Sequence, residues 1–338
     1  MTIDRFGTVA ILGRSNVGKS TFLNAALGQH LAIVSPRPQT TRDALLGVAE
    51  HGNAQIAFID TPGLHRPKSE LGRRMNAAAL EAARSADLVL FMTDVTGLRQ
   101  RFKALQTRQA LAGSEPASTD TLLHPEDRLL LSTLAPEQRA VAVINKVDQV
   151  GDKGLLLPLV EALDRCRTFA AIVPASVIRS DGVERVLDAL AAELPEGPAG
   201  YDADTITTQP VAYFAREFVR EQVLLRTAAE VPHAVAVSID QINESPEILI
   251  IKATVHVDKL GQRKIVVGRG GSTLRDIGTA ARLKIEELAG KKVHLELFVR
   301  VSARWKETPR KLAELGYEAA GRAGLPEPFD TKPARRKP

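Results

Sequence analysis

An eight-residue segment near the start of the chain could bind phosphate: Gly13-Arg14-Ser15-Asn16-Val17-Gly18-Lys19-Ser20. It matches the phosphate-loop pattern, in which a glycine is followed by any four residues and then by Gly-Lys-Ser/Thr. The apolar run 9–12 before it predicts a buried strand, and residues 20–27 after it predict a helix. A glycine loop in this setting directs backbone N–H groups and the positive end of the helix dipole at one anion. The alternative, a tight strand–helix turn with an accidental Lys-Ser, becomes less favoured with each later motif.

Residues in and beyond this loop could carry phosphoryl-transfer chemistry. Lys19 can reach the β- and γ-phosphates, and the Ser20 hydroxyl can bind magnesium. Asp60 begins an Asp-Thr-Pro-Gly segment at a strand end. Its carboxylate can hold magnesium through water, and Gly63 lets a backbone N–H approach the γ-phosphate. Thr41, or its neighbour Thr40, is the remaining candidate magnesium ligand. The predicted nucleotide-binding residues of the loop are Gly13, Asn16, Val17, Gly18, Lys19, Ser20 and Thr21. The predicted catalytic residues are Lys19, Thr41, Asp60 and Gly63. The predicted magnesium ligands are Ser20, Thr41 and Asp60.

A third motif, Asn145-Lys146-Val147-Asp148, indicates which base the nucleotide carries. The Asp148 carboxylate can accept hydrogen bonds from guanine N1–H and the 2-amino group, a donor pattern that adenine lacks. Asn145 would contact the base edge or brace the loop, and the stem of Lys146 can cover the base face. A backbone N–H at Ser176 could meet guanine O6. The three motifs occur in order, each at a predicted strand end, and together they indicate GTP and GDP as ligands.

Strands and helices alternate over residues 1–195, which predicts an α/β domain with a doubly wound parallel sheet and the ligand at the carboxyl ends of the strands. Residues 99–124 interrupt the alternation and are predicted to be an insertion, part helix and part loop. The predicted strands cover 9–12, 44–50, 55–59, 87–92, 140–144 and 172–173, and the predicted helices cover 20–27, 70–84 and 182–194.

A smaller α+β domain is predicted over 211–318, after a linker at 196–210 that is rich in proline, glycine and acids. A GXXG loop, Gly268-Arg269-Gly270-Gly271, lies between two predicted helices of this domain. The element order around it is typical of a type II KH domain. Residues 319–338 are predicted to be a flexible tail. The predicted elements are a helix at 211–229, strands at 234–242 and 247–257, a helix at 274–288 after the loop, and a strand at 292–302.

The GXXG loop could bind single-stranded RNA or DNA, because its glycines allow a sugar-phosphate backbone to approach closely. Residues 259–306 carry 12 Lys and Arg against 4 Asp and Glu, a net charge of +8. Such a surface can attract nucleic acid or an anionic membrane, or remain solvated without a partner. GXXG alone is also a common helix C-cap, but the element order and the charge favour nucleic acid. Trp305 and Phe298 could stack on bases, although core packing is the favoured role of Phe298. The predicted RNA-binding residues are Gly268, Arg269, Gly270, Gly271 and Ser272.

Composition narrows the class of protein. With 338 residues, 44% hydrophobic and 25% charged, the chain is long enough for two soluble globular domains. Its single cysteine excludes an internal disulfide and favours a reducing compartment. No apolar run approaches the ~18 residues of a membrane span, and the first residues lack the features of a signal peptide. We therefore expect a cytoplasmic protein.

The chain resembles the Era family of bacterial GTPases along nearly its whole length. The resemblance is carried by the phosphate loop, Gln39-Thr40-Thr41-Arg42, Asp60-Thr61-Pro62-Gly63-Leu64-His65, the motif at 145–148, and Val267-Gly268-x-x-Gly271 followed by Val293-His294-Leu295-Glu296-Leu297. It implies GTP hydrolysis coupled to binding of the 3′ region of 16S ribosomal RNA during assembly of the 30S subunit. It also implies peripheral association with the inner membrane, and we expect a monomer. Residues 99–124 are longer than the family usually has, and 174–178 lack a Ser-Ala pair followed by an acid.

Leu64 follows Gly63, where many GTPases have a glutamine that orients the attacking water. Because leucine cannot hydrogen-bond water, slow intrinsic hydrolysis is expected. A potassium ion bound by Asn16 could supply the missing positive charge; bracing the loop is the alternative role of Asn16. The main hypothesis is a molecular switch in which segments 31–43 and 60–75 differ between the GTP and GDP states. Two rivals are an RNA-binding assembly factor for which GTP binding alone matters, and a membrane-recruited signalling GTPase whose basic domain binds anionic lipid.

Overall fold

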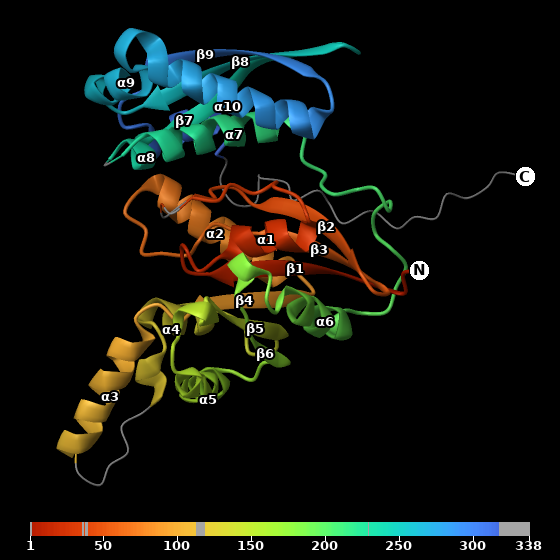
Figure 1. The fold of residues 1–338 in the computed structure, drawn as a ribbon, viewed down its shortest axis with the longest axis vertical. Coiled ribbons are helices and arrows are strands. Elements are labelled where there is room, and N and C mark those ends of the chain that lie inside the picture. The colour runs from red at the N-terminus through yellow and green to blue at the C-terminus, as the bar shows by residue number, and fades with distance from the viewer. Residues whose placement is uncertain (1, 36, 38–39, 113–118, 229, 318–338) are drawn as a thin grey trace, which may run out of the picture.

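The computed structural model describes residues 2–35, 37, 40–112, 119–228 and 230–317. Figure 1 shows a larger α/β unit that contains strands β1–β6 and, stacked on it, a smaller unit that contains β7–β9. The predicted tail at 319–338 and the centre of the predicted insertion, 113–118, lie outside the described residues. No helix in the described part of the chain is long and apolar enough to cross a membrane.

Six strands form the sheet of the larger unit, in the order β2-β3-β1-β4-β5-β6. Neighbouring strands are parallel except β2, which forms an antiparallel hairpin with β3. The predicted doubly wound sheet is therefore confirmed, with one antiparallel strand at its edge. The strands are β1 (Arg5–Gly13), β2 (Leu45–His51), β3 (Ala54–Asp60), β4 (Leu88–Asp94), β5 (Ala140–Asn145) and β6 (Ala171–Pro174).

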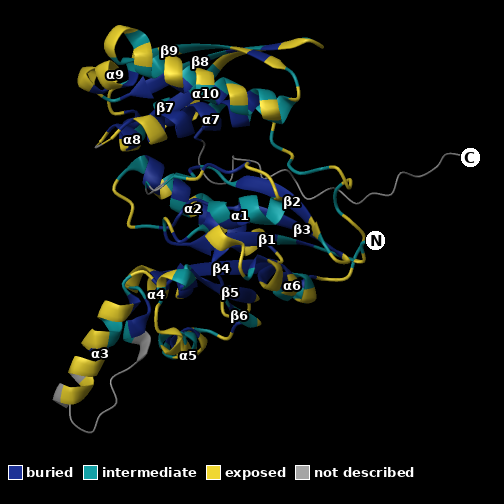
Figure 2. Ribbon diagram, viewed as in Figure 1, coloured by how far each residue is buried: buried dark blue, intermediate teal, exposed yellow. Residues whose placement is uncertain are grey.

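Helices cover both faces of this sheet, so its strands are apolar along nearly their whole length. Alternate residues of β4 divide between the two layers: Leu90 packs in the cluster that contains α1 and α6, and Phe91 in the cluster that contains α2 to α5. In Figure 2 the central strands are buried and much of α3 is exposed. The helices are α1 (Lys19–Leu27), α2 (Glu70–Ser85), α3 (Leu98–Ala112), α4 (Pro125–Leu131), α5 (Leu156–Cys166) and α6 (Val183–Glu193).

The predicted insertion begins as helix α3, which projects from the body of the domain (Figure 1). The chain then returns through a short 3-10 turn, Thr119–Leu122, and helix α4, whose Leu130 and Leu131 are buried against the sheet layer. The sequence patterns did not single out α4 or α5. The insertion is thus anchored in the domain at its second end.

The segment after α6 runs along the edge strand of the larger unit. The Val48 amide donates a 2.8 Å hydrogen bond to the carbonyl of Ile206, and the Thr207 hydroxyl donates one of 2.7 Å to the carbonyl of Leu46. Gln55 accepts hydrogen bonds from the amides of Gly200 and Tyr201. The connection between the two units is therefore held against β2 and β3 by hydrogen bonds from both its main chain and its side chains.

The smaller unit has a three-stranded sheet in the order β7-β8-β9, with β7 antiparallel and β9 parallel to β8. Helices α7 and α10 cover one face through buried residues such as Val219, Val223 and Ile277. The predicted order of helices and strands is confirmed. The elements are α7 (Val211–Arg226), α8 (Val231–Ala234), β7 (Ala236–Glu244), β8 (Ile248–Val257), α9 (Leu260–Val267), α10 (Ser272–Ala289), β9 (Lys292–Val301) and α11 (Pro309–Glu314).

Two aromatic residues of this unit occupy positions opposite to those expected. Phe298 is 53% exposed, so the favoured core role is wrong. In β9 the alternate residues Leu295 and Leu297 pack against the helix layer, which directs Phe298 to the uncovered face of the sheet. Trp305 is fully buried and packs with Met75 of α2, so it does not offer a face to a base in this structure.

Candidate nucleotide site and RNA-binding loop

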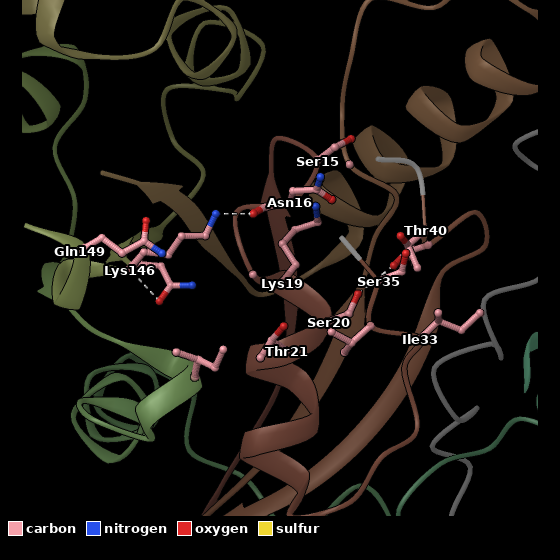
Figure 3. A pocket seen from close by; sticks show the side chains of 16 residues that line it. Ser15, Asn16, Lys19, Ser20, Thr21, Ile33, Ser35, Thr40, Lys146 and Gln149 are labelled. Atoms are coloured by element: carbon pink, nitrogen blue, oxygen red, sulfur yellow. Dashed lines mark hydrogen bonds between the residues drawn. The ribbon is translucent and has the colours of Figure 1, made fainter. Parts of the chain in front are cut away.

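The phosphate loop lines a cavity of about 450 Å³ at the carboxyl end of the larger sheet (Figure 3). Lys146 and Gln149 lie at one end of the cavity, Ser20 and Thr40 at the other, and Asn16 and Lys19 lie between them. The three predicted motifs are therefore brought together. The guanine motif therefore lies at one end of the cavity, the phosphate loop at its centre, and residues 33–35 and 40–41 at the other end.

The conformation of the phosphate loop depends on Gly18, the residue before α1. Gly18 has φ of +110°, and a Cβ there would lie 2.3 Å from the side-chain nitrogen of Asn145. The Lys19 ammonium donates 3.1 Å hydrogen bonds to the carbonyls of Gly13 and Arg14. Burial lowers the pKa of Lys19 to about 8, although Asp60 opposes this. An anion in the loop would favour the charged form of this lysine.

Three oxygen-bearing side chains meet where magnesium is predicted. The Ser20 hydroxyl donates a 2.7 Å hydrogen bond to Asp60 and lies 2.8 Å from the Thr41 hydroxyl, which is 3.3 Å from the same Asp60 oxygen. The other Asp60 oxygen is buried without a hydrogen-bond partner among the described residues. Burial raises the pKa of Asp60, against the lowering effect of Lys19. Hard oxygen donors with one oxygen unsatisfied fit Mg²⁺.

The geometry distinguishes the two candidate threonines. The Thr40 hydroxyl donates a 2.7 Å hydrogen bond to the carbonyl of Arg37, while the Thr41 hydroxyl faces Ser20 and Asp60. Thr41 is therefore the threonine placed to complete the magnesium site.

Gly63 and Leu64 lie against the phosphate loop. A Cβ on Gly63 would lie 2.8 Å from the backbone nitrogen of Ser15, so only glycine allows this approach. The Leu64 amide donates a 3.4 Å hydrogen bond to the carbonyl of Gly13, and its side chain is buried with Leu12. The side chain of Leu64, the residue after Gly63, thus points into the core and cannot orient a water molecule.

At the base end, Asn145 has the bracing role that the sequence left open. Its side-chain nitrogen donates a 2.8 Å hydrogen bond to the carbonyl of Val17, and its side-chain oxygen accepts from the amides of Lys146 and Val177. It therefore ties the guanine motif to the phosphate loop.

Asp148 is positioned by Ser176. The Ser176 hydroxyl donates a 2.6 Å hydrogen bond to the Asp148 carboxylate, which lowers the pKa of Asp148 and keeps it an acceptor. The Ser176 amide donates to the carbonyl of Asp181 in this structure, so its contact with guanine O6 stays a prediction. Ile178, 80% exposed, also lines the cavity and was missed by sequence reasoning.

Sequence reasoning also missed three buried charged residues beside the cavity. Arg14 forms ion pairs with Asp94, at the end of β4, and with Asp127 in α4. Asp94 could have been found, because an acid at the end of a parallel strand lies at the ligand edge of the sheet. Arg14 occupies a variable position of the loop pattern, and Asp127 follows an insertion, so neither carried a signal.

The predicted RNA-binding loop lies between α9 and α10. Gly268, Gly270 and Gly271 all have positive φ, and a Cβ on Gly270 would meet nothing within 4 Å. The loop is therefore open to a ligand at its tip. The exposed basic side chains around it form no ion pair within the described part of the chain; they are Arg263, Lys264, Arg269 and Arg275.

The two sites are joined by direct contacts between the units. Arg220 of α7 is fully buried, pairs with Glu217, and donates a 2.6 Å hydrogen bond to the carbonyl of Thr40. Burial would raise the pKa of Glu217, but Arg220 keeps it below its ordinary value. Arg216 donates a 2.5 Å hydrogen bond to Asp43. Helix α7 thus holds both sides of Thr41.

Arg42 of the larger unit extends into the smaller unit. It donates a 2.6 Å hydrogen bond to the carbonyl of Val235, and its guanidinium lies 5.5 Å from the ring centre of Trp305 and 6.0 Å from that of Tyr317. Leu71 of α2 packs in the same cluster as Trp305. The segments that follow Thr40 and Gly63 are therefore both in contact with the smaller unit.

Together these features define a phosphate-loop GTPase domain with a guanine-binding motif, followed by a KH domain. Family models agree: one described as "50S ribosome-binding GTPase" matches residues 8–124, and one described as "KH domain" matches 230–306. The chain belongs to the Era family of GTPases. It is 39% identical to GTPase Era of Lactobacillus helveticus over 314 residues, which cover 92% of this chain and 96% of that protein. It is 39% identical to GTPase Era of Geobacter metallireducens over 316 residues, which cover 93% and 98%.

Two solved structures resemble the whole chain. One is Era in complex with MgGDPNP and nucleotides 1506–1542 of 16S ribosomal RNA, with a TM-score of 0.82 and 34% identity over 93% of this chain and 99% of that one. The other is a variant of Aquifex aeolicus Era bound to GDP and aluminium fluoride, with a TM-score of 0.81, 34% identity and the same coverage. The similarity extends over both domains.

Proposed function

We propose that this protein is a GTP-hydrolysing switch of the cytoplasm that binds the 3′ region of 16S ribosomal RNA and acts in assembly of the 30S subunit. The GTPase domain at 1–195 would provide the switch, and the domain at 211–318 would bind RNA. The hydrogen bond from Arg220 to the Thr40 carbonyl carries the proposal, because it links the residue next to Thr41 with the RNA-binding domain. The relative that was solved with a 16S RNA fragment supports the choice of RNA.

GTP hydrolysis would depend on positioning and charge neutralisation. Lys19 would exchange its bonds to the loop carbonyls for phosphate oxygens, and the Gly63 amide would approach the γ-phosphate. Ser20, Thr41 and Asp60 would hold Mg²⁺, which when bound neutralises charge between the β- and γ-phosphates. Potassium is proposed as a further ligand at Asn16. Because Leu64 is buried, hydrolysis without a partner would be slow.

The switch would work through Thr41. In this structure its hydroxyl bonds to Ser20 and Asp60. Thr41 would help to hold Mg²⁺ in the GTP state. A shift of residues 40–43 between the GTP and GDP states would then change the hydrogen bond between the Thr40 carbonyl and Arg220. A change in bound nucleotide would therefore change the seating of α7 and of the GXXG loop.

The proposal is tested by measuring GTP turnover and RNA affinity in one preparation. The probe is an RNA with the sequence of nucleotides 1506–1542 of 16S ribosomal RNA, the fragment present with the solved relative. We expect turnover to rise on addition of this RNA and its affinity to differ between GDPNP and GDP. A scrambled RNA of equal length is the control. RNA affinity that depends on the nucleotide, with turnover unchanged by RNA, would favour the assembly factor for which GTP binding alone matters. RNA affinity that is the same with GDPNP and GDP would contradict the switch.

Membrane recruitment is tested in the same way with vesicles. Peripheral association with the inner membrane rests on the family resemblance alone. Sedimentation with vesicles of anionic phospholipid, at the ionic strength of the RNA measurement, would reveal it. If vesicles and not RNA bind and accelerate hydrolysis, the membrane-recruited signalling GTPase is the correct function. Co-sedimentation with purified 30S subunits tests the ribosomal partner, and sedimentation equilibrium tests the expected monomer.

A further inference from the structure

Four charged side chains form a continuous chain beside the nucleotide cavity. Nε of Arg14 lies 3.0 Å from both carboxylate oxygens of Asp127 in α4, and Nη2 of Arg14 donates a 2.8 Å hydrogen bond to Asp94. The second Asp94 oxygen accepts a 2.5 Å hydrogen bond from Nζ of Lys146. The order Asp127–Arg14–Asp94–Lys146 therefore joins helix α4, which follows the predicted insertion, to the phosphate loop, strand β4 and the guanine motif.

Three of these four charges are largely removed from water, so their mutual contacts matter more than those of a surface pair. Asp127 is 0% exposed, Asp94 3% and Arg14 9%. The Thr93 hydroxyl donates a further 2.6 Å hydrogen bond to Asp127. Both oxygens of the Asp127 carboxylate are thus engaged, and its main charged partner is a residue of the phosphate loop.

The series of four charged side chains holds the phosphate loop at two points. The Arg14 side chain is fixed by the two carboxylates, and the Arg14 carbonyl accepts a hydrogen bond from Lys19. Lys146 donates a second hydrogen bond, 2.7 Å, to the carbonyl of Asn16. Asn16 has φ of +65°, a conformation that costs a residue with a side chain some free energy and needs support from its surroundings. Lys146, at one end of the series of charges, supplies part of that support through its bond to the Asn16 carbonyl.

We propose that Asp127 is a positioning residue for nucleotide binding: through Arg14 it holds the phosphate loop, and through Asp94 the Lys146 side chain, in the arrangement that retains GDP. The inference rests on the proposed function and adds to it a role for the segment that follows α3. Asp127 touches no part of the cavity itself. Its loss would speed GDP release while the GXXG loop, in the other domain, keeps its affinity for RNA.

The test is the dissociation rate of N-methylanthraniloyl-GDP, measured by stopped-flow displacement with unlabelled GDP. Asp127→Asn keeps the shape of the side chain and removes its charge. We expect dissociation to become about tenfold faster, the scale of coupling between contacting residues. Glu126→Gln is the matched control, because Glu126 is the preceding residue of α4 and is exposed. Its rate should stay within about twofold of the wild-type rate.

A double-mutant cycle with Arg14→Gln shows whether the effect passes through Arg14. We expect the double variant to release the nucleotide no faster than the faster single variant, because one shared contact is lost in all three. If the increases in the GDP dissociation rate of the two single variants multiply in the double variant, the proposal is overturned. Arg14→Gln alone could fail to fold, because it leaves Asp127 buried and unpaired. In that case the GDP dissociation rates of Asp127→Asn and of the double variant still show whether the effect passes through Arg14.

Two further readouts separate positioning from mere stability. A lower melting temperature with unchanged GDP dissociation in Asp127→Asn would mean a structural role and overturn the proposal. At a saturating concentration of GDP, the affinity for the 1506–1542 RNA should stay unchanged, and a loss of RNA binding under that condition would also overturn the proposal. If the wild-type protein bound no guanine nucleotide, the proposed function itself would fail, which is a different result from an unaltered Asp127→Asn.

Discussion

The guanidinium of Arg220 donates a 2.6 Å hydrogen bond to the carbonyl oxygen of Thr40, although 180 residues separate them in the chain. Arg220 is fully buried. Thr41, the residue after Thr40, faces the predicted magnesium site. A side chain of the KH domain thus holds the main chain of a segment that, in the proposed switch, changes position when GTP binds. Whatever changes the position of Thr41 also acts on α7, because protein interiors are too closely packed to absorb such shifts locally.

The first prediction is that Arg220→Lys weakens the coupling between nucleotide and RNA. Lysine keeps the charge beside Glu217 but loses the forked geometry that reaches Glu217 and Thr40 together. We expect the ratio of RNA affinities in the GDPNP and GDP states to fall about fivefold or more, the usual range of allosteric coupling. Fluorescence anisotropy of a labelled 1506–1542 RNA measures it. Arg226→Lys, in the exposed last turn of α7, should leave the ratio intact, and an unchanged ratio in Arg220→Lys would disprove the link.

The second prediction concerns base specificity. Asp148 is held as an ionised acceptor by the Ser176 hydroxyl, a geometry suited to guanine N1–H and its amino group. Asp148→Asn should move preference from GTP to xanthosine triphosphate by about a hundredfold or more, because the asparagine amide presents a donor where xanthine has an oxygen. Competition against N-methylanthraniloyl-GDP gives both affinities. Equal competition by ATP and GTP in the wild-type protein would show that the guanine assignment is wrong.

The third prediction tests the GXXG loop with two variants at Gly270 that differ in charge. A Cβ at Gly270 meets no atom within 4 Å, and its φ of +56° is a conformation that Asn and Asp tolerate. Gly270→Asp should lower RNA affinity about tenfold or more by placing a carboxylate where phosphate is expected, while Gly270→Asn should lower it far less. GDP affinity should be unchanged in both. Gly268 is a poorer choice, because a Cβ there would lie 2.3 Å from the Thr273 hydroxyl. Equal RNA affinities of the two variants would argue against a phosphate at this loop.

The fourth prediction is a potassium response that depends on Asn16. Lys19 and Mg²⁺ neutralise only part of the charge that develops on the phosphates, and Leu64 contributes nothing because it is buried. GTP hydrolysis should be faster in potassium than in sodium at equal ionic strength. Asn16→Ala should abolish this difference and keep GTP binding, since the contact of Lys146 is to the Asn16 carbonyl and not to its side chain. Equal rates in the two salts, or a potassium response that survives in Asn16→Ala, would remove Asn16 from the mechanism.

Much of this architecture could be predicted because its signals are local in sequence. The phosphate loop needs Gly18 for its positive φ, and the guanine motif needs Asp148 for its acceptor geometry, so residue types at fixed spacing reveal both. Apolar runs bounded by glycine and polar turns indicated the parallel strands. Alternation indicated β7, and β8 and β9 followed as its hairpin partner and as the strand after the GXXG helix. The sequence motifs did not indicate helices α4 and α5, because these helices carry none of the motifs at strand ends and α4 comes after an insertion of irregular composition.

The sequence by itself determined which chemistry the chain carries, because nucleotide and RNA recognition use short segments whose residue types are tied to backbone geometry. Only the tertiary structure decided which partners those segments have. It placed Thr41 rather than Thr40 at Asp60, turned Phe298 to the open face of its sheet, and buried Arg14 against Asp127 and Arg220 against Thr40. These pairings join residues up to 180 positions apart, and they form because a buried charge must find a partner wherever the packing of the elements brings one within reach.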